Sequence, residues 1–295
     1  MVQGKFDKLF MPERLTPLFH APGYARLTAA QRLRYNQLHA GYLHEQTIFF
    51  ESAMAQPILR SLLTLQLPEG LADGLKQFRE EEAQHSQMFR ALNRRCRPEI
   101  YGCSDFHFIR LSPWQRGGLN RWVWQARRFP FFLWILLIQE ERALFYAQEF
   151  LREAERLEPE LVAAQRRHLT DEAGHIHWDE QLLDWVWPRT GRLWRGINAR
   201  LFGWMMGEFF TTPKRSGLRV VAELVQAFPE LQSQWPELRA QMLQLSHQPE
   251  FNALCYSREV TPKSFARFDR WPEFRRLGRV LPEYRPPAGD GKSPR

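Results

Sequence analysis

Apolar residues recur at helical spacing along most of the chain, and prolines and glycines interrupt the pattern where helices would end. The pattern predicts four long helices, over residues 29–65, 71–96, 130–157 and 159–187. Thr28, with Gln31 three residues later, forms a capping-box sequence that begins the first of them. Pro68 and Pro159 mark a tight turn within each pair of helices, whereas residues 97–113 predict a longer, irregular crossover. The chain is therefore expected to fold as two helical hairpins joined by one long connection.

Two hairpins joined by a long crossover are typical of the ferritin-like four-helix bundle, so the predicted fold class is all-α. Beyond residue 188 the pattern changes to shorter amphipathic segments, around residues 192–210, 216–228 and 236–247. No strand-rich region and no internal repeat is visible. We expect an N-terminal extension over 1–27, the bundle over 28–188, accessory helices packed on the bundle over 189–282, and a disordered tail over 283–295.

One run, Phe129–Ile138, is apolar enough to raise the question of a membrane span. It is roughly ten residues long, about half of the ~20 that cross a bilayer, and polar or charged residues follow and precede it. We therefore expect a buried helix segment. No signal sequence is visible at the start, and three cysteines without a CxxC pair suit a reducing compartment. The cytoplasm is the expected location.

The composition is that of an ordinary globular protein, with 44% hydrophobic and 25% charged residues, and it excludes wholesale disorder. The formal charge is +8, and arginines cluster at residues 90–97, 116–128 and 189–200. A solvated basic face is one interpretation of these clusters, and a docking surface for an acidic carrier protein or a reductase is another. Nucleic acid ranks third because no known binding motif accompanies the arginines. A homodimer is also compatible with the sequence.

The second and fourth long helices each contain a Glu-x-x-His motif, formed by Glu82 with His85 and by Glu172 with His175. Residues i and i+3 share one face of a helix, so each motif can aim a carboxylate and an imidazole at the same ion. A single copy carries little information in a chain of this length. Two copies, one in each predicted hairpin, indicate a shared metal site.

Each motif follows a glutamate at the same distance. Glu141 lies 31 residues before Glu172, and Glu51 lies 31 residues before Glu82, both within apolar stretches of their helices. An unpaired charge among apolar residues is costly, which favours a ligand role for both. Glu45 is the alternative to Glu51, but it lies 37 residues before Glu82 and breaks the symmetry. Packed together, the hairpins would present four carboxylates and two histidines.

This ligand set suits two bridged iron ions, and manganese is also compatible. Other acids on the same helices are interpreted as surface charges or as partners of the ligands, namely Glu81, Glu140, Glu149 and Glu180. His168 is a seventh candidate, because His168, Glu172 and His175 lie at i, i+4 and i+7 on one stripe of the helix. A core or surface histidine is the alternative interpretation of His168.

The segments HEQTIFFE (44–51), EExxH (81–85), the third-helix glutamate and HxxxExxH (168–175) resemble the AurF-type di-iron N-oxygenases, which oxidise arylamines towards nitro compounds. The extra histidine before the final motif distinguishes this branch from other ferritin-like proteins. The resemblance covers roughly residues 35–180 and implies two iron ions, O₂ as a co-substrate and an external electron donor. The iron ligands that it implies are Glu51, Glu82, His85, Glu141, His168, Glu172 and His175.

The resemblance also implies roles for residues beside the ligands. Glu81 and Asp171 would hold the ring N–H groups of the histidine ligands, although exposed helix acids are the alternative interpretation. Members that oxidise aminobenzoate place an arginine near the first ligand to bind the substrate carboxylate, and the matching residue here is Gln46. Aminobenzoate itself is therefore not the expected substrate.

The leading hypothesis is a di-iron oxygenase that uses O₂ to oxidise an amine or another small organic substrate, free or bound to a carrier. A C–H hydroxylase or desaturase on the same scaffold is one alternative, and an iron-binding protein without catalytic activity is another. A basic protein that associates with nucleic acid, with incidental Glu-x-x-His motifs, is the last. Metal content separates the last alternative from the others, and O₂ consumption separates the enzymes from the iron-binding protein.

Overall fold

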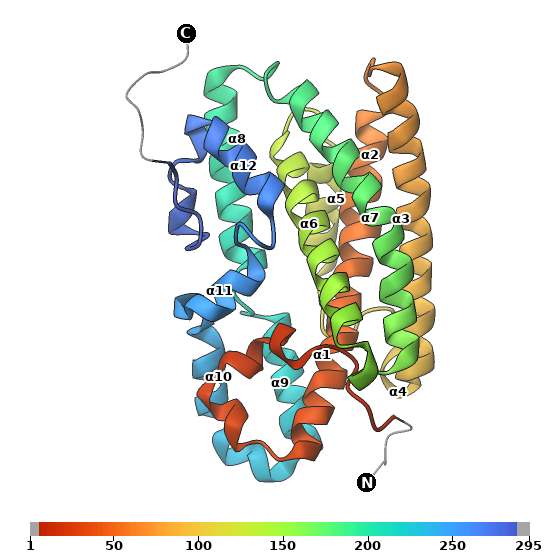
Figure 1. Ribbon diagram of the computed structural model, residues 1–295, viewed down its shortest axis with the longest axis vertical. Helices are drawn as coiled ribbons and strands as arrows, with labels where there is room; N and C mark the ends of the chain where they lie inside the picture. The colour runs from red at the N-terminus through yellow and green to blue at the C-terminus, as the bar shows by residue number, and fades with distance from the viewer. Residues whose placement is uncertain (1–5, 288–295) are drawn as a thin grey trace.

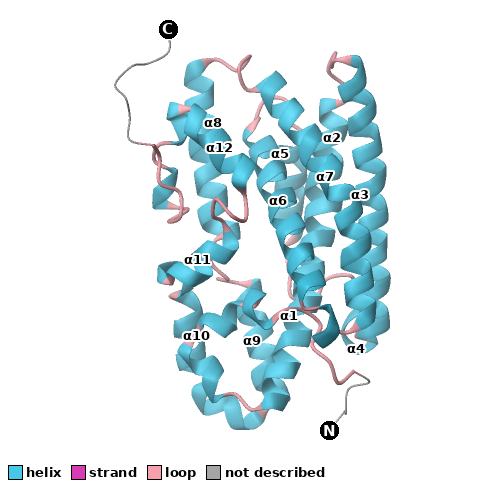
Figure 2. Ribbon diagram, in the orientation of Figure 1, coloured by secondary structure: helices cyan, strands magenta, loops and turns pink. Residues whose placement is uncertain are grey.

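Helices account for most of the structure (Figure 2), a computed structural model that describes residues 6–287. No β-strand occurs among those residues, so the predicted all-α class is confirmed. The long helical runs are α1 (Ala29–Phe50) with its continuation α2 (Gln56–Leu62), α3 (Glu69–Cys96), α6 (Phe131–Arg152) and α7 (Pro159–Val186). The shorter helices are α4 (Pro98–Tyr101), α5 (Pro113–Val123), α8 (Arg192–Met205), α9 (Ser216–Ala227), α10 (Trp235–Leu243), α11 (Pro249–Cys255) and α12 (Pro262–Arg270).

The first long run begins at the predicted cap and contains one irregularity. Thr28 Oγ1 accepts a hydrogen bond from the backbone N–H of Gln31 at 3.3 Å, and the Gln31 side chain accepts one from the N–H of Thr28 at 2.9 Å. The sequence predicts an uninterrupted helix to residue 65, but a π-helical turn covers Glu51–Ala55 between α1 and α2. Such turns are frequent at functional sites. The turn begins at a predicted ligand, Glu51.

The long helices form a bundle in which α1 contacts α3, α3 contacts α7, and α7 contacts α6 (Figure 1). The first hairpin consists of α1 and α2 with α3, and the second consists of α6 with α7. Between the hairpins, residues 97–130 include α4 and α5 and carry the chain from one end of the bundle to the other (Figure 1). This is the ferritin-like arrangement, with an inward face on each of four helices.

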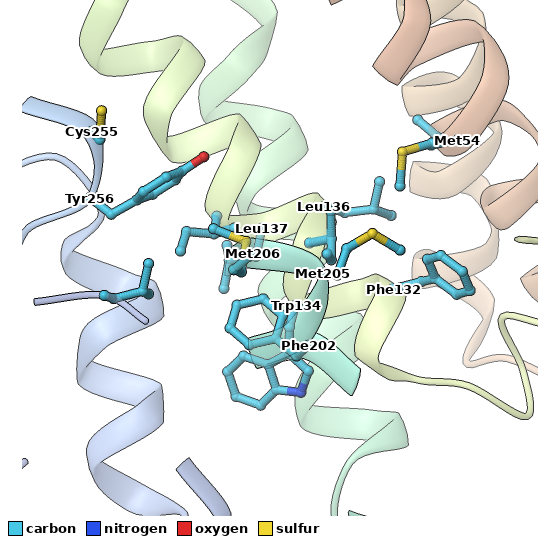
Figure 3. Close-up of a cluster of buried hydrophobic side chains, with 14 of the residues drawn as sticks. Met54, Phe132, Trp134, Leu136, Leu137, Phe202, Met205, Met206, Cys255 and Tyr256 are labelled. Atoms are coloured by element: carbon cyan, nitrogen blue, oxygen red, sulfur yellow. The ribbon is translucent and has the colours of Figure 1, made fainter. Parts of the chain in front are cut away.

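The apolar run at the start of α6 lies in the core. Every residue from Phe131 to Ile138 is at most 1% exposed. This run belongs to a buried cluster that also contains Phe202 and Met205 of α8 (Figure 3). Met206, in the turn after α8, lies in the same cluster. Between residues 6 and 287, no helix combines the length and the hydrophobicity that crossing a bilayer requires.

The segments before α1 and after α8 pack beside the bundle and on each other. Asn36 of α1 accepts a hydrogen bond from the backbone N–H of Phe10 at 2.7 Å, and the N–H of Gly23 donates to Gln241 of α10 at 2.8 Å. Further helix contacts join α9 to α1 and α12 to α6. Both α11 and α12 lie in the predicted accessory region but outside its three amphipathic segments, 192–210, 216–228 and 236–247.

The predicted tail over residues 283–295 is only partly within the described chain. Tyr284 is 2% exposed, and its ring lies against those of Phe265 and Phe268 of α12. Packed structure therefore continues past residue 283, whereas residues 288–295 lie outside the part that the structure describes.

Candidate metal centre

Seven ionisable side chains from all the long helical runs meet inside the bundle. Each of them is at most 5% exposed. They are Glu51 from the π-helical turn, Glu82 and His85 from α3, Glu140 from α6, and His168, Glu172 and His175 from α7. We call these seven residues the carboxylate–histidine cluster. Four carboxylates and three imidazoles thus share a buried space.

Two overlapping groups within the cluster have the spacing of metal ligands, because each residue offers one ligand atom within 4.8 Å of the others in its group. The first group is Glu82, His85, Glu172 and His175, and the second is Glu51, His85 and His168. In the first group, His175 Nδ1 lies 3.4 Å from Glu82 Oε1. It also lies 3.7 Å from Glu140 Oε2, which adds the carboxylate of α6.

Many polar atoms of the cluster have no hydrogen-bond partner. They are Glu51 Oε1, both carboxylate oxygens of Glu82 and of Glu172, and Nδ1 of His85 and of His175. A buried polar atom without a partner is destabilising and calls for a physical explanation. Carboxylate oxygens and imidazole nitrogens are the donors that iron, manganese and zinc accept in proteins. The residues present therefore fit a dinuclear metal site.

Burial and mutual repulsion shift the pKa values of these carboxylates. Burial first, and then repulsion from Glu140, raises the pKa of both Glu82 and Glu172 well above the usual range. Burial also raises the pKa of Glu51. For Glu140, burial acts in the same direction, but the close approach of Glu172 and His175 outweighs it and lowers the pKa. Bound cations would favour the anionic form of all four side chains.

A carboxylate from the opposite hairpin holds each histidine of the two motifs. His85 Nε2 of α3 lies 2.9 Å from Asp171 Oδ2 of α7, and His175 Nε2 of α7 lies 3.0 Å from Glu81 Oε2 of α3. An ionised carboxylate only accepts hydrogen bonds, so Nε2 is the donor and Nδ1 keeps its lone pair. The Nδ1 atoms are the ones near the cluster carboxylates. Glu81 and Asp171 thus make the contacts that the family resemblance implies for them.

His168 also faces the cluster. Its Nε2 lies 2.7 Å from Glu172 Oε1 and 3.6 Å from Glu51 Oε1. The edge of its ring meets the His85 ring with a centroid distance of 4.6 Å. His168 is 5% exposed, which excludes the alternative of a surface histidine. The structure therefore brings His168 between the carboxylates of α7 and of the π-helical turn.

Glu141, the predicted ligand from α6, does not join the cluster. Its Oε1 accepts a hydrogen bond from the backbone N–H of Lys263 at 2.6 Å, and its Oε2 accepts one from that of Ser264 at 2.8 Å. Both N–H groups belong to the first turn of α12, where a helix leaves donors free to bind an anion. Glu140, interpreted from the sequence as a surface or accessory acid, lies beside His175 instead. Of these two glutamates, the structure thus places Glu140, and not the predicted Glu141, beside the cluster.

Glu45, the alternative to Glu51, is directed at the crossover. Its carboxylate accepts four hydrogen-bond donors from that segment. The donors are the backbone N–H groups of His107, Phe108 and Ile109 and the hydroxyl of Tyr101. In Glu51, by contrast, Oε2 accepts a hydrogen bond from Ser86 Oγ at 2.7 Å and Oε1 has no partner. This geometry favours Glu51 over Glu45 as the ligand.

A cavity of about 90 Å³ reaches the cluster at Glu51, Glu140 and His168. The rest of its wall is partly apolar, with Leu43, Phe50, Ala143 and Phe210, and partly polar, with Gln46, Gln139, Arg142 and Gln165. Apolar walls with a few polar anchors are typical of sites for small molecules. The cavity is therefore the candidate substrate site.

Arg142 brings a positive charge to this cavity without a carboxylate partner. Its guanidinium donates to the hydroxyls of Tyr146 and Tyr256 at 3.2 and 3.3 Å, and its Nε has no partner. No ion pair joins it to an acidic side chain between residues 6 and 287.

No motif in the sequence singles out Arg142 or Glu140. The available signal is a charged triplet, Glu140 to Arg142, directly after the apolar run of α6.

Comparison with known proteins agrees with the geometry of the site. A model of the family "P-aminobenzoate N-oxygenase AurF" matches residues 1–242, which include the whole cluster and all the long helical runs. None of the curated proteins compared with the chain matches it. The family consists of oxygenases with a ferritin-like, all-α fold, so the resemblance carried by the motifs is confirmed. The chain belongs to the AurF family of p-aminobenzoate N-oxygenases.

Proposed function

We propose that the protein is a non-haem di-iron oxygenase that transfers one oxygen atom from O₂ to the nitrogen of a small amine. The observation that carries this proposal is the buried cluster of carboxylates and imidazoles with unpartnered atoms, placed at the wall of a cavity. Membership of an N-oxygenase family supports nitrogen as the atom that is oxidised.

Two iron ions would be held by Glu51, Glu82, His85, Glu140, His168, Glu172 and His175. Bound iron would supply the electron transfer and the Lewis acidity that O₂ activation requires. Asp171 and Glu81 would fix the rings of the two motif histidines, keep their tautomers and raise their basicity. Manganese is the alternative metal for this set of donors.

The proposed reaction balances with an external electron donor. An amine, O₂, two electrons and two protons give a hydroxylamine and water, so one oxygen atom enters an N–H bond and the other leaves as water. The chain contains no CxxC pair that would serve as a dithiol reductant. A separate reductase or a small reductant would therefore supply the electrons.

The cavity favours a small amine that carries a negative charge. Its volume of about 90 Å³ is well below the several hundred Å³ typical of sites for drug-sized ligands. Gln46 of α1 offers no charge there, but Arg142 of α6 lines the same cavity and has only neutral partners. A guanidinium binds carboxylates in a fixed orientation. Arg142 would therefore orient the amine group towards the cluster and away from itself.

The test is a set of small arylamines with and without a carboxylate, incubated with iron-loaded protein, a reductant and isotopically labelled O₂. Mass spectrometry should show one labelled oxygen on nitrogen, with the carboxylate-bearing amines preferred. Arg142→Gln should raise KM for these amines by about 10- to 100-fold, the usual range for a lost hydrogen bond to a charged group. Labelled oxygen on carbon would support a C–H hydroxylase instead. The absence of any labelled product from protein with two bound irons would contradict the proposal.

A further inference from the structure

Large apolar side chains on the surface are concentrated in two segments. Among residues 6–287, seven such side chains are more than a third exposed, and six of them lie within residues 113–130 and 189–209. The six are Trp114, Trp124, Leu193, Trp194, Trp204 and Phe209, with Trp114 90% and Leu193 82% exposed. The seventh, Phe19, lies in the segment before α1. Scattered exposed apolar residues are normal, but this concentration needs an explanation.

Ring contacts join the two segments, and we call their exposed apolar residues and arginines the tryptophan–arginine face. The ring of Trp122, at the end of α5, lies 6.0 Å from that of Trp204 in α8. Phe129 lies 5.5 Å from Trp194, whose ring N–H donates to the carbonyl oxygen of Arg128. Trp204 in turn meets Phe209 edge to face at 5.8 Å. The face therefore runs from the start of α6 along α8 to the turn that follows it.

The same face carries strong positive charge. Its eight arginines are Arg116, Arg121, Arg127, Arg128, Arg189, Arg192, Arg195 and Arg200. Only Arg195 forms an ion pair within the described residues, with Glu273. The single acid of the two segments, Glu208, pairs with Lys214 and Arg215 outside the face. Seven arginines are thus exposed and without an acidic partner.

Three of these arginines surround a hollow in the surface. Arg127, Arg128 and Arg189 line it together with Trp194, and its volume is about 550 Å³. No carboxylate lines this hollow. Arginine side chains around one hollow can bind a phosphate, which accepts several hydrogen bonds and carries a full negative charge. An anionic group beside exposed apolar side chains is the chemistry of a phospholipid headgroup.

We infer that the tryptophan–arginine face binds the surface of an anionic lipid bilayer. Tryptophan and leucine side chains would enter the interfacial region, and the arginines would contact lipid phosphates while their apolar stems cover the hydrocarbon boundary. Each basic residue near such a surface strengthens binding by attraction to anionic lipids. The protein would lie on the membrane without crossing it, in agreement with the lengths of its helices.

Two other occupants fit the face less well. In a two-fold dimer the same patch lies on both subunits, so unpaired arginines would meet arginines with almost no acid to compensate them. An acidic protein would account for the arginines, but it would leave Trp114 and Leu193, the two most exposed of the six apolar side chains, without a role. A bilayer accommodates both kinds of side chain.

The test is sedimentation of the full-length protein with vesicles of phosphatidylcholine, with and without phosphatidylglycerol. The wild-type protein should sediment with the mixed vesicles and stay in solution with the neutral ones. Arg127→Gln with Arg128→Gln and Arg189→Gln should weaken binding by about 100-fold, because each arginine contributes about fivefold. Trp114→Ser with Leu193→Ser should weaken vesicle binding by about tenfold, and this loss of binding should remain at high salt.

Matched controls are available elsewhere on the surface. Phe19→Ser removes the exposed aromatic residue outside the face, and Arg239→Gln with Arg166→Gln and Arg167→Gln removes three exposed arginines that form no ion pair among residues 6–287. Both controls should bind mixed vesicles as the wild type does. All variants should keep the metal content of the wild type, because the metal centre is buried inside the bundle.

Three results would overturn the inference. The first is equal binding to neutral and anionic vesicles, or equal binding by the face variants and their controls. The second concerns soluble poly-glutamate. If Trp114→Ser with Leu193→Ser binds it as tightly as the wild type does, an acidic protein would be identified as the partner. The third is a dimer in solution that this pair of substitutions converts to a monomer.

Discussion

The two hairpins can be compared through the buried glutamates of their first helices, and in each hairpin the two glutamates have different partners. The first helix of each hairpin carries two buried glutamates near the cluster, Glu45 and Glu51 in one and Glu140 and Glu141 in the other. One glutamate of each pair enters the cluster. The other accepts hydrogen bonds from a segment outside the hairpins, which is the crossover for Glu45 and α12 for Glu141.

The comparison shows that position along a helix does not decide which glutamate is a ligand. Glu45 and Glu141 have their oxygens bonded to N–H groups, so folding alone compensates their burial. Glu51 keeps an oxygen without a partner, and Glu140 Oε2 lies 3.7 Å from His175 Nδ1 of the cluster. The unpartnered oxygen of Glu51 is therefore available to a metal, whereas the bonded oxygens of Glu45 and Glu141 are not.

The largest expected effect concerns the neighbours Glu140 and Glu141. Glu140→Ala should lose one of two iron ions and at least about 100-fold in activity, because it removes a carboxylate that faces the cluster. Glu141→Ala should keep both ions and lose thermal stability instead, because the first turn of α12 loses its acceptor. Iron content after anaerobic loading and thermal unfolding of the metal-free protein measure the two effects. The reverse assignment of the two defects would contradict the comparison.

An intermediate effect separates Glu45 from Glu51 in the metal-free protein. Glu45→Ala should lower the free energy of unfolding by about 3 kcal/mol, because it leaves several buried donors of the crossover without an acceptor. Glu51→Ala should leave that free energy unchanged or raise it, because it removes a buried carboxylate whose pKa is raised by burial.

Chemical denaturation of the two metal-free variants measures this difference. After iron loading, Glu45→Ala should bind both ions and Glu51→Ala should bind one. A metal-free Glu51→Ala protein that is less stable than Glu45→Ala would show that Glu51 serves the fold and not the metal.

The smallest effect is expected at His168. His168→Ala should fold and keep both ions, because four carboxylates and two imidazoles remain. The ratio of product formed to O₂ consumed should change, since the number of nitrogen ligands alters the electronic properties of the iron. His44→Ala is the matched control, because His44 is equally buried but hydrogen-bonds Asn93 at 2.7 Å outside the cluster. An unchanged ratio in His168→Ala would exclude a ligand role.

The sequence predicts the parts of the site that depend on helix periodicity. The two Glu-x-x-His motifs and His168 lie on single faces of α3 and α7, so spacing alone places them together. The third-helix ligand differs because Glu140 and Glu141 are adjacent, and the choice between them depends on α12. That helix lies more than a hundred residues later, and its amphipathic pattern over nine residues is too short to predict with assurance.

Other features escape prediction for related reasons. The π-helical turn at Glu51 changes the register within an otherwise regular helix, and no residue type marks it. Arg142 lines the cavity only because α6 presents it beside Tyr146 and Tyr256, the latter from the accessory region. The existence of the long helices is thus readable from local pattern, whereas short helices such as α12 and the partners of a buried charge depend on tertiary contacts.

The most direct test of the account is an anomalous difference map at the iron absorption edge, from crystals of protein loaded with iron without oxygen. The account predicts two peaks within the cluster, with a carboxylate oxygen of Glu140 and of Glu51 within roughly 2.0–2.3 Å of an ion. It also predicts that Glu141 stays bonded to the first turn of α12. A peak ligated by Glu141, or no peak among the seven residues, would contradict it.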